Sequence, residues 1–460
     1  MHFLALALLA AAVDLGTRLE MFVDEFLVER KSNVEHRLTE PTKREVVLEL
    51  NKPWEGPVSA YFTVFRDGEK IRMYYRGGGD DNAFTCYAES TDGIHFARPE
   101  LGIFELDGSK TNNILFRGPH SASFAPFRDA NPNAKPDERY KALCYEVVGK
   151  HGTMTAMASA DAIHWRRMKE GSVVSPGEYD SLNCVSWDAI EKQYRVFDRY
   201  WTGGGYSGVR AIETRTSDDF LNWSEPTPFK YADGVPVEHF YTGAVTRCPG
   251  AEHVWLAFPK RFVPDRKRVA SHKEVGVSDA VFMSSRDAVN WERPFREAWI
   301  RPGADERNWT DRNNMPAWGI VETPAATAAA DGAGATFSMY VSEHYRWPTN
   351  RLRRVTVRRH GFASMRAGAR AEGEFVTKPL TFGGDRLTLN FATSAAGSVR
   401  VEMQDEAGTM LAESETMFGD ELEQPVAWKS GDVKSHAGKP VRLRFVMTDA
   451  DVYAFRIGRQ

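Results

Sequence analysis

The sequence predicts an all-β protein, a five-bladed β-propeller followed by a C-terminal β-sandwich. Three observations support this: a seven-residue phrase recurs along the chain, short strand-like runs dominate it, and the pattern of the runs changes after about residue 372. A repeat made of short strands is typical of units arranged around an axis rather than of one wound sheet.

The recurring phrase is a Ser, a nearby Asp, a tight turn, and then His or Asn followed by an aromatic residue. We call it the Ser/Asp phrase. Its four copies occupy residues 90–96, 159–165, 217–223 and 285–291. The copies stand roughly 60 to 70 residues apart, a spacing that fits one copy per four-stranded unit. We predict that the repeated residues Asp92, Asp161, Asp219 and Asp287 belong to turns before outer strands and are not four active sites.

Each predicted blade consists of four short strands, and an Asp-Gly pair at residues 67–68 marks the first hairpin. The predicted strands are 60–65, 71–75, 84–89 and 94–97 in blade one; 122–128, 140–147, 154–159 and 163–167 in blade two; 182–187, 194–200, 208–215 and 221–223 in blade three; 241–247, 253–259, 280–285 and 289–293 in blade four; 315–321, 337–342, 352–357 and 362–365 in blade five. Blade five lacks the Ser/Asp phrase. Residues 18–50 are predicted to close or brace the ring, and the Ala/Gly-rich residues 325–335 to form an outer hairpin.

These patterns divide the chain into three parts. Residues 1–16 are a possible signal-like segment, residues 17–371 the propeller, and residues 372–460 a β-sandwich of short alternating strands. The apolar residues 1–12 resemble the core of a signal peptide but lack a Lys or Arg before the apolar run, and they are too short to span a bilayer. A secreted or periplasmic protein is expected, with a cytoplasmic one as the alternative.

Composition excludes several classes of function. A formal net charge of −4 gives no electrostatic case for nucleic acid or for an anionic membrane. The four cysteines lie one per repeat without a CxxC pair, which predicts buried free thiols rather than a zinc site, with one or two disulfides as the alternative if the protein is exported. The absence of Walker, GxGxxG, GxSxG and HExxH motifs argues against nucleotide binding, serine hydrolysis and zinc proteolysis. The oligomeric state stays open.

The candidate catalytic residues lie where a propeller gathers polar side chains, at the entrance end of the first strand of each blade. Read in blade order, this position holds Glu55, His120, Asp180, Glu238 and Asp311. Carboxyl groups that gather at one dry point raise one another's pKa, as a general acid requires. We predict Asp180 and Glu238 as the main pair, with Glu55 and Asp311 tuning them. Turn residues and salt bridges are the alternative explanation for each acid.

Other side chains near the same ends are candidates for substrate binding. Arg and Asn can contact vicinal hydroxyls or a carboxylate, and Trp can stack on a sugar face. The alternative is that they hold loops together. The candidates are Trp54, Arg76, His120, Asn183, His239, Tyr241, Arg312, Asn313, Glu343 and Trp347.

The chain resembles the five-bladed propeller glycoside hydrolases of families 32, 43 and 68. The Ser/Asp phrase carries the resemblance over residues 85–300, and the tail resembles the C-terminal β-sandwich of invertase- and levanase-like enzymes at residues 398–405, 419–420, 426–429, 438–445 and 452–455. The resemblance implies an axial pocket with two essential carboxylates and a third acid that tunes them. The Trp-Met-Asn-Asp-Pro-like and Glu-Cys motifs of family 32 are missing, so fructan specificity does not carry over.

The expected function is a glycoside hydrolase acting on a polysaccharide or oligosaccharide, with Glu238 as proton donor and Asp180 as nucleophile or base. Carboxyl groups about 5 Å apart would mean retention of configuration, and about 6.5 to 9.5 Å inversion. The chemistry requires no cofactor, and a calcium ion in the channel is an open alternative. A non-catalytic carbohydrate-binding propeller and a glycan lyase or phosphorylase are the competing functions.

Overall fold

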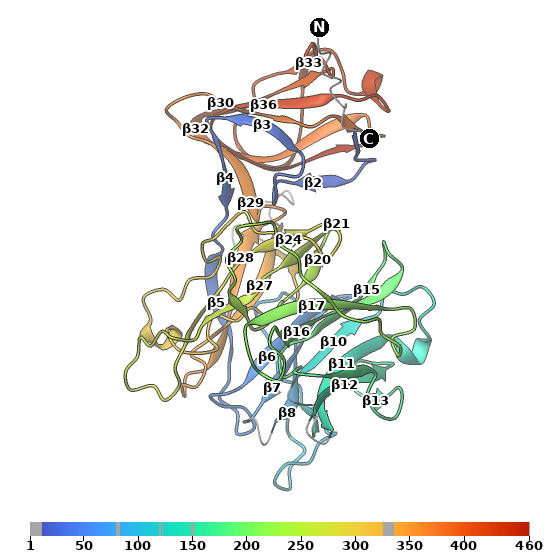
Figure 1. Cartoon of the computed structure of the whole chain (residues 1–460), viewed down its shortest axis with the longest axis vertical. Helices are drawn as coiled ribbons and strands as arrows, with labels where there is room; N and C mark the ends of the chain where they lie inside the picture. The colour runs from blue at the N-terminus through green and yellow to red at the C-terminus, as the bar shows by residue number, and fades with distance from the viewer. Residues whose placement is uncertain are drawn as a thin grey trace. The chain divides into compact units, whose positions relative to one another are not determined.

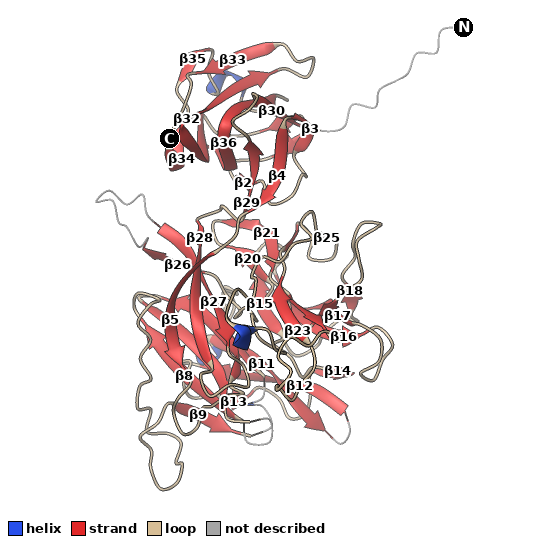
Figure 2. Cartoon of the chain, turned by 90° about the vertical axis from the view of Figure 1, so that its left-hand side faces the viewer, coloured by secondary structure: helices blue, strands red, loops and turns tan. Residues whose placement is uncertain are grey.

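Nearly all regular structure in the chain is β-strand. The computed structural model describes residues 12–79, 83–118, 121, 123–148, 151–324 and 335–459. Within these ranges the named helical elements are three short 3-10 turns, Pro136–Glu138, Glu306–Asn308 and Lys434–His436 (Figures 1 and 2). The all-β class predicted from the sequence is confirmed.

The chain divides into two units, each with its own internal packing. The larger unit contains residues 40–326 and 335–357, and the smaller one contains residues 1–39, 327–334 and 358–460, in each case as far as the structure describes them. Neither unit is one continuous stretch of sequence, because an N-terminal segment is assigned to the same unit as the C-terminal end. The predicted boundaries at 17 and 372 therefore differ from the observed ones.

The larger unit contains five sheets in which successive strands pair antiparallel, mostly in chain order. They are β6 (Ala60–Asp67), β7 (Lys70–Gly77), β8 (Phe84–Ser90) and β9 (Ile114–Arg117); β10 (Phe124–Arg128), β11 (Tyr140–Val148), β12 (His151–Ser159), β13 (Arg166–Arg167) and β14 (Val174–Gly177); β15 (Cys184–Asp188), β16 (Gln193–Trp201), β17 (Arg210–Ser217) and β18 (Thr227–Pro228); β20 (Thr246–Cys248), β21 (Ala251–Ala257), β24 (Met283–Ser285) and β25 (Trp291–Glu292); β26 (Val321–Pro324), β27 (Ala335–Glu343), β28 (Arg351–Arg358) and β5 (Thr42–Glu49). A further small sheet contains β19 (His239–Phe240), β22 (Lys260–Val263) and β23 (Val277–Ala280). These sheets are what five propeller blades require, and the number of blades stays our interpretation of them.

The sheet of β26, β27 and β28 is completed by β5, a strand from near the start of the chain. Strand β5 pairs antiparallel with β28, with Glu49 opposite Arg351 and Leu48 opposite Leu352. The strand predicted at 362–365 exists from residue 363 on, but its assignment as the fourth strand of blade five was wrong. Those residues fall in β29 (Ala363–Ala367), which pairs with β4 (Val34–Leu38) and with β36 (Arg442–Gly458) in the smaller unit.

The smaller unit is built on a ten-stranded network of pairings around two long strands, β32 (Arg386–Gln404) and β36. Its other members are β2 (Leu19–Met21), β3 (Val28–Ser32), β4, β29, β30 (Gly373–Thr377), β33 (Met410–Ser414), β34 (Asp420–Pro425) and β35 (Trp428–Ser430), and β1 (Val13–Asp14) pairs separately with β31 (Leu380–Thr381). The N-terminal Phe22 packs in its core, 5.0 Å between ring centroids from Phe375. Residues 19–38 were predicted as part of the propeller domain but are held here by pairing and by core packing.

The Ser/Asp phrase forms the same hydrogen-bonded turn in all four copies. In the second copy, Asp161 Oδ1 accepts from the backbone N–H groups of Ile163 and His164, and Ser159 Oγ accepts from that of Ala162. The ring of His164 bonds the other oxygen of Asp161, at 2.8 Å. The remaining copies repeat these contacts, with Asn in place of His in the third and fourth. This explains why the phrase admits His or Asn, and it confirms that the repeated Asp residues are turn residues.

The four cysteines, Cys86, Cys144, Cys184 and Cys248, are buried free thiols. Within the described ranges, the structure contains no helix that is long and apolar enough to cross a bilayer. The predicted signal-like segment lies largely outside the described residues, as does most of the predicted outer hairpin at 325–335.

Candidate active site

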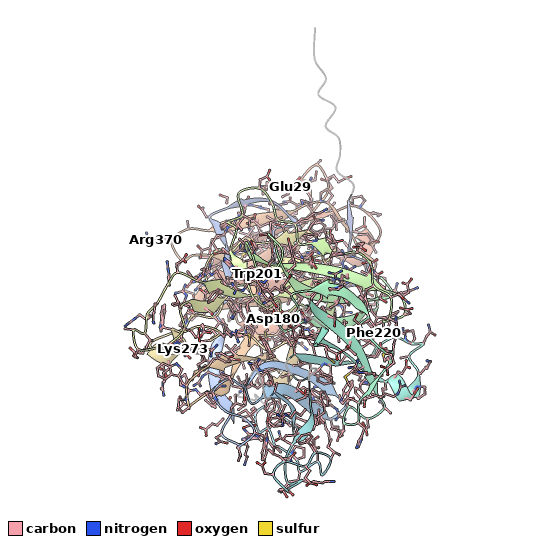
Figure 3. The ribbon with its side chains drawn as sticks, turned by 60° about the horizontal axis from the view of Figure 1, so that its bottom comes forward. Glu29, Asp180, Trp201, Phe220, Lys273 and Arg370 are labelled. Atoms are coloured by element: carbon pink, nitrogen blue, oxygen red, sulfur yellow. The ribbon has the colours of Figure 1, made fainter. Side chains whose placement is uncertain are left out.

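A cavity of about 210 Å³ lies where the first strands of the larger unit's sheets begin. We call it the Asp180 cavity. Its lining residues are Tyr61, Arg76, Ser123, Tyr145, Asp180, Tyr241 and Arg312. Three of them lie at or shortly before a first strand, namely Tyr61 in β6, Ser123 before β10 and Asp180 before β15, and Arg76 and Tyr145 belong to the second strands β7 and β11. Figure 3 labels Asp180 and Trp201 toward the middle of the view, and each of them contacts Arg199. The sequence predicted a gathering of acids at this position, and of the predicted acids Asp180 lines the cavity.

Two tyrosines form the centre of the lining. The hydroxyl groups of Tyr61 and Tyr241 lie 2.8 Å apart, and each lies within hydrogen-bond distance of the Asp180 main-chain oxygen, at 3.4 and 3.2 Å. Burial raises the pKa of Tyr61 well above its ordinary value, which keeps this hydroxyl neutral and able to donate. Tyr61 also has a φ of 59°, an uncommon left-handed conformation for a residue other than glycine.

Asp180 is the carboxylate of the cavity. Its Oδ1 accepts a hydrogen bond from Arg199 of β16, and Arg199 also donates to the Glu178 main-chain oxygen at 2.6 Å. Arg199 is buried, whereas the Asp180 side chain is 40% exposed. The carboxylate is therefore held by the buried Arg199 guanidinium and remains partly exposed at the cavity.

Two further arginines line the cavity from different strands. Arg76 of β7 donates to the main-chain oxygen of Val58 at 2.7 Å and to the hydroxyl of Tyr345 at 3.2 Å. Arg312 donates to the same Tyr345 hydroxyl at 3.1 Å. Two guanidinium groups thus converge on one neutral oxygen.

A lysine lies behind Tyr241. Lys260 of β22 is 0% exposed, and its Nζ sits 4.0 Å from the centroid of the Tyr241 ring. The structure gives this Nζ no hydrogen-bond partner among the described residues. Burial, followed by the charge of Arg312, lowers the pKa of Lys260 well below its ordinary value.

The other three predicted acids lie elsewhere or at the margin. Asp311 is next to the lining residue Arg312, with its Oδ2 3.4 Å from Arg346 Nε and 3.9 Å from Arg312 Nε. Glu238 does not line the cavity, and its two oxygens accept from Arg261 and Arg293 at 3.0 and 2.6 Å.

Glu55 also stands apart from the cavity lining. Its carboxylate accepts from the Tyr75 hydroxyl and from the Arg98 guanidinium, at 2.5 and 2.8 Å, inside the first sheet's packing. These contacts make it part of a buried network that joins the segment before β6 to the turn that follows β8.

Three of the predicted binding residues, Arg76, Tyr241 and Arg312, line the cavity. His239 lies beside it, where its Nδ1 accepts from the backbone N–H of Arg210 at 3.3 Å. His120 lies outside the described residues.

The remaining predicted binding residues have contacts that hold loops and sheets together. Asn183 and Asn313 bond the backbone of their own turns or of Tyr345, and Glu343 pairs with Arg351 and Arg353. Trp54 donates to Asn113 at 2.7 Å, and Trp347 packs beside His272.

The sequence analysis missed four contributors: Tyr61, Ser123, Tyr145 and Arg199. It searched for acids, whereas the cavity is built mainly from tyrosine hydroxyls and arginines. A signal was present for Arg199, because a charged residue inside the largely buried strand Gln193–Trp201 needs a partner or a function.

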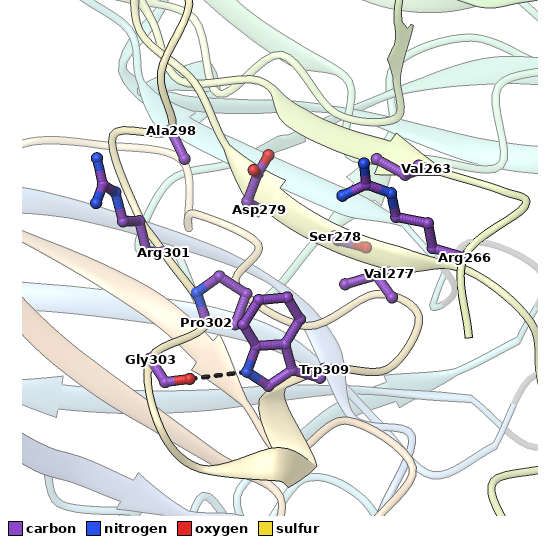
Figure 4. Close-up of a pocket in the computed structure, with 10 residues that line it drawn as sticks. All are labelled: Val263, Arg266, Val277, Ser278, Asp279, Ala298, Arg301, Pro302, Gly303 and Trp309. Atoms are coloured by element: carbon purple, nitrogen blue, oxygen red, sulfur yellow. Dashed lines mark hydrogen bonds between the residues drawn. The ribbon is translucent and has the colours of Figure 1, made fainter. Parts of the chain in front are cut away.

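A second cavity has a volume of about 390 Å³ (Figure 4). It adjoins the Glu238 cluster, which we define as Glu238, Arg261, Asp279 and Arg293, through Asp279. Asp279 lines this cavity together with Val263, Arg266, Val277, Ser278, Ala298, Arg301, Pro302, Gly303 and Trp309. The Trp309 indole donates to the Gly303 carbonyl at 2.7 Å. In the part of the chain that the structure describes, three or more His, Cys, Asp or Glu side chains nowhere gather as a metal site would require.

No family model and no curated protein matches this chain. Solved structures do resemble it. An N-acetylgalactosamine deacetylase from F. plautii in complex with blood group B trisaccharide is 14% identical over 70% of this chain and 94% of its own, with a TM-score of 0.45. A family 43 arabinoxylan arabinofuranohydrolase from Bacillus subtilis is 10% identical over 89% of this chain and 98% of its own (TM-score 0.38). A fructofuranosidase from Schwanniomyces occidentalis is 9% identical over 95% and 100% (TM-score 0.40). Similarity at these levels is too low to transfer an activity.

Proposed function

We propose that the chain is a glycoside hydrolase whose active site is the Asp180 cavity. One observation carries the proposal: where the first strands converge, a carboxylate held by a buried arginine faces a cavity lined with hydroxyl and guanidinium groups. The cavity is smaller than the roughly 300 to 1,000 Å³ of drug-sized sites, so it suits a single sugar unit better than a long chain.

Asp180 acts in this proposal as the nucleophile or general base. Arg199 fixes the position of its carboxylate, and positioning of this kind lowers the barrier by removing motions that would otherwise have to be frozen in the reaction. The Tyr61 and Tyr241 hydroxyls lie beside the same residue and hold sugar hydroxyls. No cofactor takes part.

We assign the second carboxyl group to Asp311 rather than to Glu238. Asp311 adjoins the lining residue Arg312, and its Oδ1 is buried without a hydrogen-bond partner in the described residues. Both oxygens of Glu238 are already engaged by arginines, and Glu238 does not line the cavity.

A non-catalytic carbohydrate-binding protein is the second candidate. It is favoured by one observation: Asp180 is the single acid among the seven residues that line the cavity. A binding protein needs no carboxylate pair.

The two functions separate in one experiment. The wild type and the variants Asp180→Asn, Asp311→Asn and Glu238→Gln are incubated with neutral and acidic polysaccharides and with aryl glycosides, and released reducing sugar is measured. The proposal and the assignment are supported if the wild type and Glu238→Gln release sugar and Asp180→Asn and Asp311→Asn do not. Release lost in Glu238→Gln but kept in Asp311→Asn reverses the assignment of the second acid. Glycan binding without release by any protein favours the binding protein.

A further inference from the structure

We propose that Tyr206 forms a second sugar-binding position beside the Asp180 cavity, where its ring stacks on the substrate unit next to the one that the cavity holds. This rests on the proposed function, because it names a further contact of the same substrate. The inference comes from the connection between β16 and β17, which contributes no residue to the cavity lining.

The connection consists of residues 202–209, which we call the glycine hairpin, and contains four glycines and one aromatic residue, Tyr206. Tyr206 is 54% exposed, and its φ of 66° lies in the left-handed region that favours glycine. An exposed aromatic side chain is ordinary by itself, whereas a strained residue beside a cavity is typical of a functional position. The hairpin thus keeps a tyrosine where a fifth glycine would avoid the strain.

The glycine hairpin has a fixed shape. The Gly203 N–H donates to the main-chain oxygen of Ser207 at 3.0 Å, which closes the tip. Gly208 has a φ of 80°, and a Cβ added to it would lie 2.8 Å from the Gly203 nitrogen, so this position requires glycine. The two arms therefore pack closely and hold Tyr206 in one place between them.

The hairpin is also tied to the segment that carries Asp180. The Gly205 N–H donates to Glu178 Oε1 at 3.1 Å. The main-chain oxygen of Glu178 accepts from Arg199, the arginine that holds the Asp180 carboxylate. A continuous set of hydrogen bonds therefore fixes the backbone beside Tyr206 relative to Asp180.

The Tyr206 side chain is oriented by its neighbours. Its ring meets that of Trp201 edge to face, with 6.0 Å between centroids and 67° between planes. Burial raises the pKa of Tyr206, and the Asp180 charge and a hydrogen bond with the lining residue Tyr145 act in the same direction. The hydroxyl end thus lies near the cavity, while more than half of the residue stays open to solvent.

A sugar chain that leaves the Asp180 cavity needs a contact of this kind. The cavity, at about 210 Å³, suits one sugar unit, so the next unit of an oligosaccharide lies outside it. The C–H groups on one face of a sugar ring are apolar and pack against an aromatic ring, while the hydroxyl groups around its edge remain in water. The exposed ring of Tyr206, held beside the cavity, offers such a surface.

The test measures how affinity grows with ligand length, by titration calorimetry in an Asp180→Asn background so that no bond is cut. The probes are the mono-, di- and trisaccharides of the xylo-, arabino-, galacto- and galacturono-oligosaccharide series. Tyr206→Ala removes the ring, and Tyr206→Phe keeps it. The matched control is Phe418→Ala, which removes a 74% exposed aromatic side chain from the smaller unit.

We expect the disaccharide of at least one series to bind about three- to tenfold more tightly than its monosaccharide. Tyr206→Ala should lose this gain and leave the affinity for the monosaccharide unchanged. Tyr206→Phe and Phe418→Ala should keep the gain. Thermal unfolding of each variant shows whether the fold survives.

Equal affinity for mono- and disaccharides in every series, or no binding to any probe, overturns the inference. An equal loss of both affinities in Tyr206→Ala also overturns it, because Tyr206 would then shape the cavity and not a second position. If Tyr206→Phe loses the gain as Tyr206→Ala does, the hydroxyl group and not the ring makes the contact, and stacking is wrong.

Failure of the proposed function is seen separately, in the assay of released reducing sugar. A protein that cuts no bond but loses its length gain in Tyr206→Ala keeps the second position without the hydrolase activity. A wild type that releases sugar and shows no length gain is a hydrolase without the second position.

Discussion

The Asp180 cavity and the Glu238 cluster are both rich in arginine and acid, but their charges are balanced differently. In the Glu238 cluster, Arg261 bonds both Glu238 and Asp279, and Arg293 bonds the second oxygen of Glu238. In the Asp180 cavity, Arg76 and Arg312 share a neutral hydroxyl. A gathering of acids is therefore a poor guide to a site when each acid is paired with arginines.

The largest effect should follow from Asp180→Asn, which removes the carboxylate from the cavity and keeps its shape. We expect kcat/KM to fall by about 10²- to 10⁴-fold or more on the substrate that the panel identifies. The loss of stability should be smaller than in Glu238→Gln, because Asp180 is partly exposed and bonds a single arginine, Arg199, which also donates to the Glu178 main-chain oxygen. The ratio of reducing-sugar release between the wild type and Asp180→Asn measures the fall in activity. Activity retained within a factor of about three would move the chemistry away from Asp180.

Glu238→Gln should show the opposite pattern. The change leaves the buried Arg293 with a neutral partner and weakens the bond to Arg261, so we expect a loss of about 1 to 3 kcal/mol in the free energy of unfolding. Urea denaturation measures the loss. Activity at a temperature well below the unfolding transition should stay near the wild-type value. A stable but inactive variant would mean that the two regions have exchanged roles.

The pH dependence of stability tests the protonation of the buried Lys260, whose Nζ has no hydrogen-bond partner among the described residues. Its pKa is lowered in the folded protein, so the unfolded chain binds the extra proton and the free energy of unfolding rises with pH up to the ordinary lysine value near 10.5. Lys260→Met should remove this rise and stabilise the protein at neutral pH, by about 1.4 kcal/mol for each unit of lowering. Chemical denaturation between pH 6 and 9 measures the slope. The exposed Lys273 gives the control Lys273→Met, whose slope should match the wild type. An unchanged slope in Lys260→Met would show that Lys260 is charged in the fold.

The smallest effect on activity is expected from substitution of the Asp residues of the Ser/Asp phrase, whose carboxylates are engaged in their own turns. Asp161→Ala removes two hydrogen bonds from backbone N–H groups and one from His164, so we expect a loss of about 1 to 2 kcal/mol in stability. Activity should not change, because Asp161 does not line the cavity. Asp161→Asn keeps one acceptor oxygen and should lose less, as thermal melts of the two variants would show. A lost activity in either variant, with the fold intact, would contradict a purely structural role.

The sequence allowed much of the fold to be predicted, because the signals for it are local. Strand runs, hairpin turns and the Ser/Asp phrase each depend on a few neighbouring residues. Partner choice is not local: nothing in residues 19–38 indicates that they pair with strands more than 300 positions later. That is why they were assigned to the propeller.

The candidate site was predicted in part for a similar reason. Asp180, Tyr241 and Arg312 stand close to a first strand and could be found by position. Glu55, proposed for the first blade, is held in the packing of the first sheet, and Tyr61 and Ser123, which lie nearer the first strands, line the cavity instead. Arg199 reaches Asp180 from the second strand of its sheet, a contact that only the folded arrangement reveals.

The pairing of β2 with β36 means that the smaller unit cannot complete its pairing until almost the whole chain has been synthesised. Glu20 pairs with Phe455, so the first strands of the smaller unit leave the ribosome long before their partner exists. At about 5 to 20 residues per second, this wait is on the order of 20 to 90 seconds. During this wait, β5 can pair with β28 and β4 with β29 as soon as those strands emerge, while Leu19–Met21 keeps an open edge and apolar side chains until β36 is made. We therefore expect β2 to stay without its partner strand for longer than β4 or β5 during synthesis.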